Sequence, residues 1–320
     1  MTNKKPVALC GPRKKISPRR SEEREGNAKK ILERLTSRFS SRTSHLRGAL
    51  LCELSNKEIS TRVLVVYFLL AMALSVLVNL VLFPGTLFDP LERATGGLIN
   101  ATLQANLLGL ALFALFVFGL GRLRPADVGL EWRKLPQALL VTGLLWLGMQ
   151  VAALAISLLR GGVALDAVWV ERGAGAVLGW LIGQLLGNAL VEELLYRGLL
   201  LPQLFHKFKI GNRRLRLVAA AAAMLALFVL SHIPNRIFMG YTVGEMLIDI
   251  PILLGYGLLF TIIYLVTENL FVAVGVHALV NEPTLVTALP FPAQLILLVM
   301  VVVMLVVWRR FNNEAVSSHS

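Results

Sequence analysis

The stretch Ala176–Leu200, AVLGWLIGQLLGNALVEELLYRGLL, decides how the rest of this sequence is interpreted. Up to Val191 it carries no charge and is mostly apolar, which is the composition of a helix inside a lipid bilayer. Two carboxylates and a guanidinium then follow, at Glu192, Glu193 and Arg197. A charged side chain near the bilayer centre costs about 3 kcal/mol, so we expect these groups to face the interior of a helix bundle and to have a function there.

The composition of the whole chain agrees with a membrane protein. Of its 320 residues, 56% are hydrophobic and only 16% are charged, whereas soluble domains carry about 25% charged residues. The mean hydropathy is +0.69. A transmembrane helix needs about 20 apolar residues, and the candidate segments are Val63–Phe83, Leu98–Leu120, Leu135–Leu159, Ala174–Leu200, Leu217–Ile233, Leu247–Val266, Leu270–Leu289 and Gln294–Trp308. The sequence therefore predicts an all-α, polytopic bundle of about eight transmembrane helices.

Basic residues are distributed unevenly along the chain. Residues 1–60 hold 15 Lys and Arg against 6 Asp and Glu, so nine of the thirteen net positive charges lie before the first apolar segment. A basic tail beside a membrane span is typical of the cytoplasmic side and of contact with anionic lipid, and nucleic acid is not expected as a partner. The tail contains both cysteines, so no disulfide framework is expected in the membrane part.

The loops between the candidate spans give the expected orientation. Apart from the tail, the segments on one side of the predicted bundle are the loop after the second span, the loop after the fourth span and the C-terminus. They hold four, five and two basic residues, eleven in total, and the loops on the opposite side hold four. By the positive-inside rule, both termini should be cytoplasmic (N-in and C-in). We expect a flexible basic tail at residues 1–60, a transmembrane domain at 61–310 and a short cytoplasmic tail at 311–320. The chain should be an integral multi-pass protein, located in the plasma membrane if it is prokaryotic.

The charged motif separates into two parts on a helix. Glu193 and Arg197 are four residues apart, so they share a face and can form an ion pair that is structural. Glu192 is five residues from Arg197, about 140° around the helix, and it remains available for another partner. The alternative is that all three side chains only hold helices together.

Two more polar pairs interrupt apolar helices, Phe228 with His232 and His277 with Asn281, each at a spacing of four residues. The alternatives are a histidine that only packs and an ordinary interhelical His–Asn hydrogen bond. With a turn near Gly211, Glu192 lies 19 residues before the turn and His232 lies 21 after it. The three sites should therefore reach similar depth and form one pocket below the cytoplasmic surface, with Phe228 supporting the imidazole.

This set of groups is suited to hydrolysis. No serine or cysteine stands in a triad-like context, so the expected nucleophile is water, activated by Glu192 as general base. One imidazole can orient the water, and the other imidazole with the amide can stabilise an oxyanion during peptide-bond hydrolysis. Glu192, His232 and His277 could instead hold zinc, since two histidines and one glutamate are a familiar ligand set. HExxH is absent, so we expect catalysis that requires no cofactor, with zinc as the alternative.

The segments EELLYRG, FVLSH and VGVHALVN resemble the EExxxR, FxxxH and HxxxN motifs of the CAAX protease and bacteriocin-processing (CPBP) family, which includes the type II CAAX prenyl endopeptidases. The resemblance covers roughly residues 175–290 and implies an intramembrane endopeptidase. It further implies Glu192 as the base, with Glu193 and Arg197 as its neighbours and His232 positioning the water. His277 and Asn281 would form the oxyanion pair. The implied substrate is a peptide or protein, including one lipidated at its C-terminus.

Two other function classes use the same features. A non-catalytic immunity or scaffold protein could use the polar core for stability alone. A proton-coupled transporter could use the buried Glu and His, but the chain shows no inverted repeat and no pair of Gly- or Pro-broken helices.

Overall fold

The computed structural model describes residues 57–317, and it describes side chains as far as residue 308. This part of the chain is built of helices and contains no strand; its only β-pairing is an isolated bridge between Leu165 and Thr287. The all-α membrane fold predicted from the sequence is confirmed. The predicted basic tail lies outside the described residues, except for its last four positions.

Six apolar helical segments are long enough to cross a bilayer. They are α2 (Thr61–Leu77) with η1 (Val78–Leu82), α4 (Ala101–Phe113) with η2 (Ala114–Leu120), α5 (Leu135–Leu159) preceded by η4 (Trp132–Lys134), the continuous run of α6 (Ala167–Gly183), η5 (Gln184–Asn188), α7 (Ala189–Glu193), η6 (Leu194–Leu200) and α8 (Leu201–Lys207), then α9 (Arg213–Phe238) and α10 (Val243–Thr267). Two further helices have shorter apolar parts, α11 (Leu270–Asn281) and α12 (Gln294–Ser317). The number of eight spans therefore stays a prediction. Short helices in the loops are α3 (Asp89–Ala94) and the 3₁₀ turn η3 (Pro125–Val128).

The seventh helix is shorter than the sequence predicted. It was expected at Leu270–Leu289, but α11 ends at Asn281. Pro283 explains the difference, because a proline disfavours the helical conformation of the residue before it, and Glu282 accordingly leaves the helix. Beyond that point the apolar residues form a loop. The last helix, α12, continues to Ser317, past the boundary expected at residue 310.

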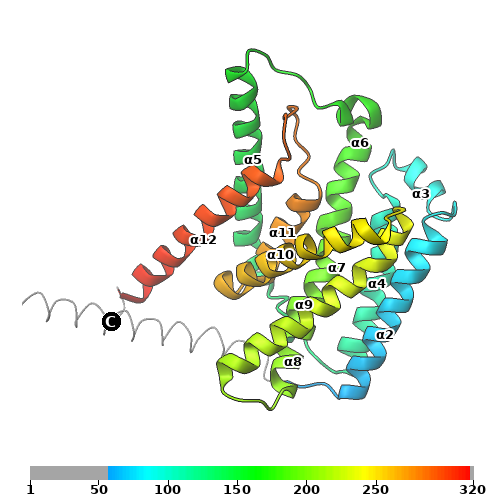
Figure 1. The fold of residues 1–320 in the computed structure, drawn as a ribbon, viewed down its shortest axis with the longest axis vertical. Helices are drawn as coiled ribbons and strands as arrows, with labels where there is room; N and C mark the ends of the chain where they lie inside the picture. Colours follow the sequence, from blue (N-terminus) through cyan, green and yellow to red (C-terminus); the bar gives the residue numbers. More distant parts are fainter. Residues whose placement is uncertain (1–56, 318–320) are drawn as a thin grey trace, which may run out of the picture. The chain divides into compact units, whose positions relative to one another are not determined.

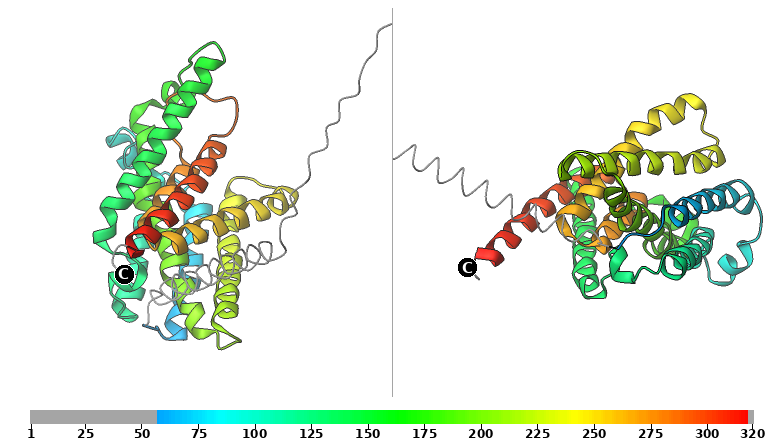
Figure 2. Two further views of the ribbon diagram at one scale, coloured as in Figure 1. Left: turned by 90° about the vertical axis from the view of Figure 1, so that its left-hand side faces the viewer. Right: turned by 90° about the horizontal axis from the view of Figure 1, so that it is seen from below.

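Helix α11 forms the centre of the core. Its residues from Val272 to Val280 are all buried, as expected for a helix that is apolar on every side. It packs against α5, α7 and α10, and the core around it contains Met149 of α5, Phe260 of α10 and Val301 of α12. Figure 1 shows α9 and α10 as a hairpin inclined to the more upright helices α5 and α6, and Figure 2 gives the same hairpin from two further sides.

A row of glycines brings the motif-bearing helix close to α4. Gly175, Gly179, Gly183 and Gly187 recur every four residues on α6 and η5. A Cβ atom on Gly179 would lie only 1.9 Å from the carbonyl oxygen of Gly97, and one on Gly183 would lie 2.8 Å from Oδ1 of Asn100. Only glycine permits this contact between helix and backbone, which fixes the position of the helix that carries Glu192.

Candidate active site

Glu193 and Arg197 form the innermost part of the site. The Glu193 Oε1 to Arg197 Nη1 distance is 3.0 Å, and neither side chain is exposed, so the ion pair predicted from the spacing is present. Arg197 also donates through Nη2 to the Gly257 carbonyl at 2.6 Å and through Nε to Thr261 Oγ1 at 3.4 Å. The guanidinium is thereby bound to α10 as well as to its own helix.

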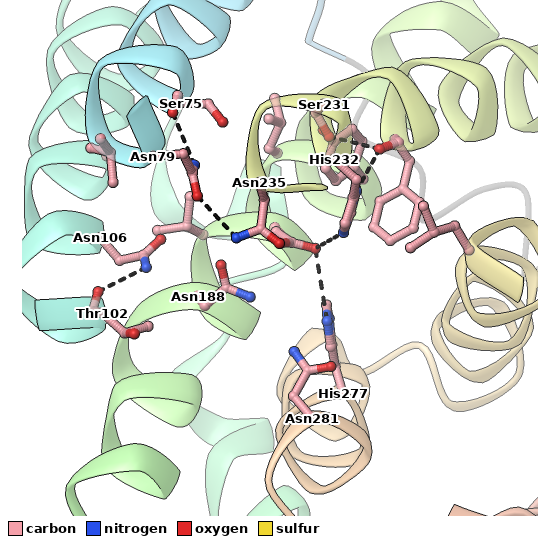
Figure 3. Close-up of a pocket in the computed structure, with 18 of the residues that line it drawn as sticks. Ser75, Asn79, Thr102, Asn106, Asn188, Ser231, His232, Asn235, His277 and Asn281 are labelled. Atoms are coloured by element: carbon pink, nitrogen blue, oxygen red, sulfur yellow. Dashed lines mark hydrogen bonds and ion pairs between the residues drawn. The ribbon is translucent and has the colours of Figure 1, made fainter. Parts of the chain in front are cut away.

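Glu192 points away from this pair, toward the two histidines. Its Oε2 lies 3.9 Å from Nε2 of His232 and 3.8 Å from Nε2 of His277. The same oxygen is buried, and no described residue makes a hydrogen bond to it. Figure 3 shows the rings of His232 and His277 facing the same part of the pocket. The structure therefore brings together one group from each of α7, α9 and α11.

The hydrogen bonds of the rings fix their tautomers. His232 Nδ1 lies 2.7 Å from the Phe228 carbonyl, and because a carbonyl only accepts, Nδ1 carries the proton. His277 Nδ1 lies 2.8 Å from Glu193 Oε1, which requires the same tautomer. In the neutral rings, both Nε2 atoms then present lone pairs to Glu192. Phe228 packs on His232 with ring centres 4.5 Å apart, and Phe260 stacks on His277 at 4.2 Å.

Asn281, the fourth predicted catalytic residue, is placed differently from the other three. It follows His277 by one turn of α11, and both side chains face the pocket in Figure 3. Its Nδ2, however, donates to Oε1 of Gln184 at 2.9 Å, and the residue is exposed. In this arrangement Asn281 contacts Gln184 rather than the carboxylate of Glu192. A neutral His277 carries its proton on Nδ1 and therefore has no N–H at Nε2.

The pocket is a cavity of about 860 Å³. Its wall contains a group of polar side chains that was not predicted from the sequence and includes Asn79, Thr102, Asn106, Gln184, Asn188 and Asn235. A signal for two of them was available, because Gln184 and Asn188 precede Glu192 at intervals of four residues and must therefore share its side of the helix.

The cavity lies nearer to one set of loops than to the other. No lining residue comes from segments 113–134, 197–227 or 261–276, which include two of the basic loops. The lining comes from α2 and η1, from α4, from η5 to η6, from the second half of α9, from the middle of α10 and from the end of α11. The expectation of a pocket below the cytoplasmic surface therefore stays a prediction. The number of residues between Gly211 and each side chain gives the relative depths of Glu192 and His232. It does not give the side of these residues on which the free space lies.

Comparisons with known proteins agree with the family resemblance. Residues 172–282 match the model of the family described as Type II CAAX prenyl endopeptidase Rce1-like, and the matched segment contains all three motifs. No curated protein and no solved structure gives a significant match.

Proposed function

Starting from the Rce1-like segment at residues 172–282, we propose that this protein is an intramembrane endopeptidase that hydrolyses a peptide bond with water activated by Glu192. The observation that carries the proposal is the buried Glu192 Oε2, which faces two imidazole nitrogens within a cavity among apolar helices. Carboxylate, imidazole and enclosed space are the parts that general-base hydrolysis requires.

The distances within the site suit a bridging water. The separations of 3.9 and 3.8 Å between Glu192 Oε2 and the two Nε2 atoms are too long for direct hydrogen bonds. A water between Glu192 and His232 can donate one hydrogen to each, and its lone pair then points at the scissile carbonyl carbon. Glu192 takes the proton as the C–O bond forms and delivers it to the amine as the C–N bond breaks.

The oxyanion of the intermediate needs donors, and we assign them to His277 and Asn281. His277 donates to the oxyanion through an N–H at Nε2 in its protonated form, and its ring lies between the carboxylates of Glu192 and Glu193. Asn281 contributes Nδ2–H once this group exchanges its bond to Gln184 for one to the substrate. One such donor is commonly worth about 10²–10³ in rate.

The same three side chains have the chemistry of a zinc site. Glu192 supplies a carboxylate, and His232 and His277 each direct an Nε2 lone pair toward it. Zinc held there would polarise the carbonyl and make bound water more acidic. We propose the metal-independent form, in which the carboxylate and the imidazoles themselves move the proton.

The substrate that we propose is a peptide or protein that reaches the cavity within the membrane. A protein lipidated at its C-terminus is one candidate, because the matched family is named for prenyl endopeptidases. The charge distribution supports three further proposals. The basic tail contacts anionic lipid, the tail is cytoplasmic, and the protein is inserted in a plasma membrane.

The decisive experiment is the Glu192→Gln variant, assayed on a peptide that the wild-type protein cleaves. Loss of a general base lowers the rate by about 10²–10⁴, so we expect cleavage to become nearly undetectable while folding is retained. Glu171→Gln, a change of an exposed carboxylate on α6, serves as the matched control and should cleave normally. Full activity of Glu192→Gln would refute the proposal. Equal complementation of a knockout by Glu192→Gln and His277→Ala would favour an immunity or scaffold role instead.

A further inference from the structure

A row of neutral amides leads along the cavity wall to Glu192. Gln184, Asn188 and Glu192 follow one another at steps of four residues, and Asn188 Nδ2 donates to Gln184 Oε1 at 3.4 Å. Asn106 reaches the same cavity from α4. Figure 3 shows Asn106, Asn188 and Asn281 around the open space beside the two histidines. The row begins in the cavity wall and ends at the carboxylate that we propose as the base.

These amides have hydrogen-bonding groups that the protein does not use. Asn106 donates through Nδ2 to the Thr102 carbonyl, and Asn281 donates to Gln184. Within the described part of the chain, Oδ1 of Asn106, Oδ1 of Asn188 and Nε2 of Gln184 take part in no hydrogen bond. A carboxamide both donates and accepts, so the row offers both kinds of group to a ligand. It carries no charge, and therefore suits a neutral ligand.

The main chain of a peptide is such a ligand. Inside a membrane, every N–H and C=O group needs a partner, and a peptide that leaves its helical form loses the partners it had. An extended peptide directs these groups to one edge at every second residue, about 6.6–6.8 Å apart. The step from Asn188 to Glu192 runs along α7 and rises about 6 Å, which is close to that repeat. The step from Gln184 to Asn188 lies in the π-helix η5, whose rise per residue is smaller.

We infer, on the basis of the proposed function, that Gln184 and Asn188, with Asn106 opposite, form a subsite for the main chain of an extended peptide substrate. With the scissile bond at Glu192, Asn188 binds the main chain two residues away and Gln184 binds it four residues away, on one side of the bond. Recognition by this subsite depends on the substrate's backbone and tolerates changes of its side chains.

The test is a scan of a cleaved peptide with single backbone N-methyl groups, each of which removes one N–H donor. Loss of one hydrogen bond should lower kcat/KM about five- to tenfold. We expect this loss on one side of the bond at the second residue, whose N–H is accepted by Asn188 Oδ1. Little change is expected at the fourth residue, because the unused Nε2 of Gln184 is a donor and binds a C=O group there. In Asn188→Leu, kcat/KM of the unmodified peptide should fall similarly, and the further effect of methylation at the second residue should disappear.

The uncharged Asn188→Gln variant, which keeps the carboxamide, is the control for folding. It keeps an oxygen acceptor at this position, so it should retain the effect of methylation at the second residue. The subsite alone would be overturned if methylation lowered kcat/KM of the wild-type protein equally at every residue. It would also be overturned if all methylated peptides lost kcat/KM equally in Asn188→Leu. Failure of the wild-type protein to cleave any peptide would overturn the proposed function and the subsite with it.

Discussion

Two adjacent carboxylates with different environments allow a sharp test of the site. In Glu193→Gln, the buried Arg197 loses a counter-charge at 3.0 Å, and neither side chain of the pair is exposed. Breaking a buried ion pair by removing one partner costs about 3–5 kcal/mol. Arg197 keeps its hydrogen bonds to the Gly257 carbonyl and to Thr261, so we expect a loss near the lower end, about 3 kcal/mol.

The same substitution at the neighbouring position should act on catalysis instead. In Glu192→Gln, no ion pair at hydrogen-bonding distance is lost, because both imidazole nitrogens are 3.8 Å or more from the carboxylate. Its free energy of unfolding should stay within about 1 kcal/mol of the wild-type value, while cleavage falls by the factor expected for a general base. The two variants should therefore differ in stability, whereas both should lower activity, because Glu193 also accepts the hydrogen bond from His277 Nδ1.

Both quantities can be measured on protein purified in mixed micelles, with tryptophan fluorescence reporting unfolding and a quenched peptide reporting cleavage. The control is the double variant Glu193→Leu with Arg197→Met, since replacing a buried pair by apolar side chains is often close to neutral. A Glu193→Gln protein as stable as the wild type, or a double variant less stable than Glu193→Gln, would contradict a structural role for the pair.

Three further outcomes are expected. Gly179→Ala should lower the free energy of unfolding by about 1–3 kcal/mol, because its Cβ would lie 1.9 Å from the Gly97 oxygen. Gly143→Ala, where nothing lies within 4 Å, should be neutral or more stable by up to about 1 kcal/mol, and equal effects of the two changes would refute the close contact. Burial raises the pKa of Glu282 above its ordinary value of 4.5, and Arg172 partly opposes this, so the carboxyl lowers stability as pH rises through its raised pKa. Glu282→Gln should thus melt above the wild type at neutral pH, with a gap that closes below about pH 4.5; a gap independent of pH would contradict this. Treatment with a zinc chelator should leave cleavage unchanged, whereas a loss that Zn²⁺ but not Mg²⁺ restores would make the three converging side chains zinc ligands.

The parts of the fold that the sequence predicted correctly are those that lipid constrains most strongly. Long apolar runs must be helical in a bilayer because every backbone group needs a partner, and the six long helices follow from this. The pair of Glu193 with Arg197 was also predictable, because it depends only on spacing within one helix. The loop after Asn281 was not recognised, because its apolar composition resembles that of a span and only Pro283 indicates the break.

The polar wall of the cavity was harder to predict for a physical reason. A charge in an apolar helix is so costly that it attracts attention, whereas a neutral amide such as Asn188 costs little and looks like an ordinary packing residue. The partner of Asn281 lies on another helix, at Gln184, and depends on how α11 packs against η5. Spacing within a helix cannot supply such a contact between helices.

The position of the cavity also bears on how a substrate reaches it. Basic residues outside the tail gather on one set of loop and terminal segments, eleven against four, and the cavity lies toward the other set. A cytoplasmic location of the basic loops would put Tyr241 and Glu282, which line the cavity, on the other side of the membrane. The positive-inside rule rests on many charges, whereas the expected depth of the pocket rested on counting residues from one turn. We therefore propose that a peptide enters the cavity from the side of Tyr241 and Glu282, and not from that of the basic loops.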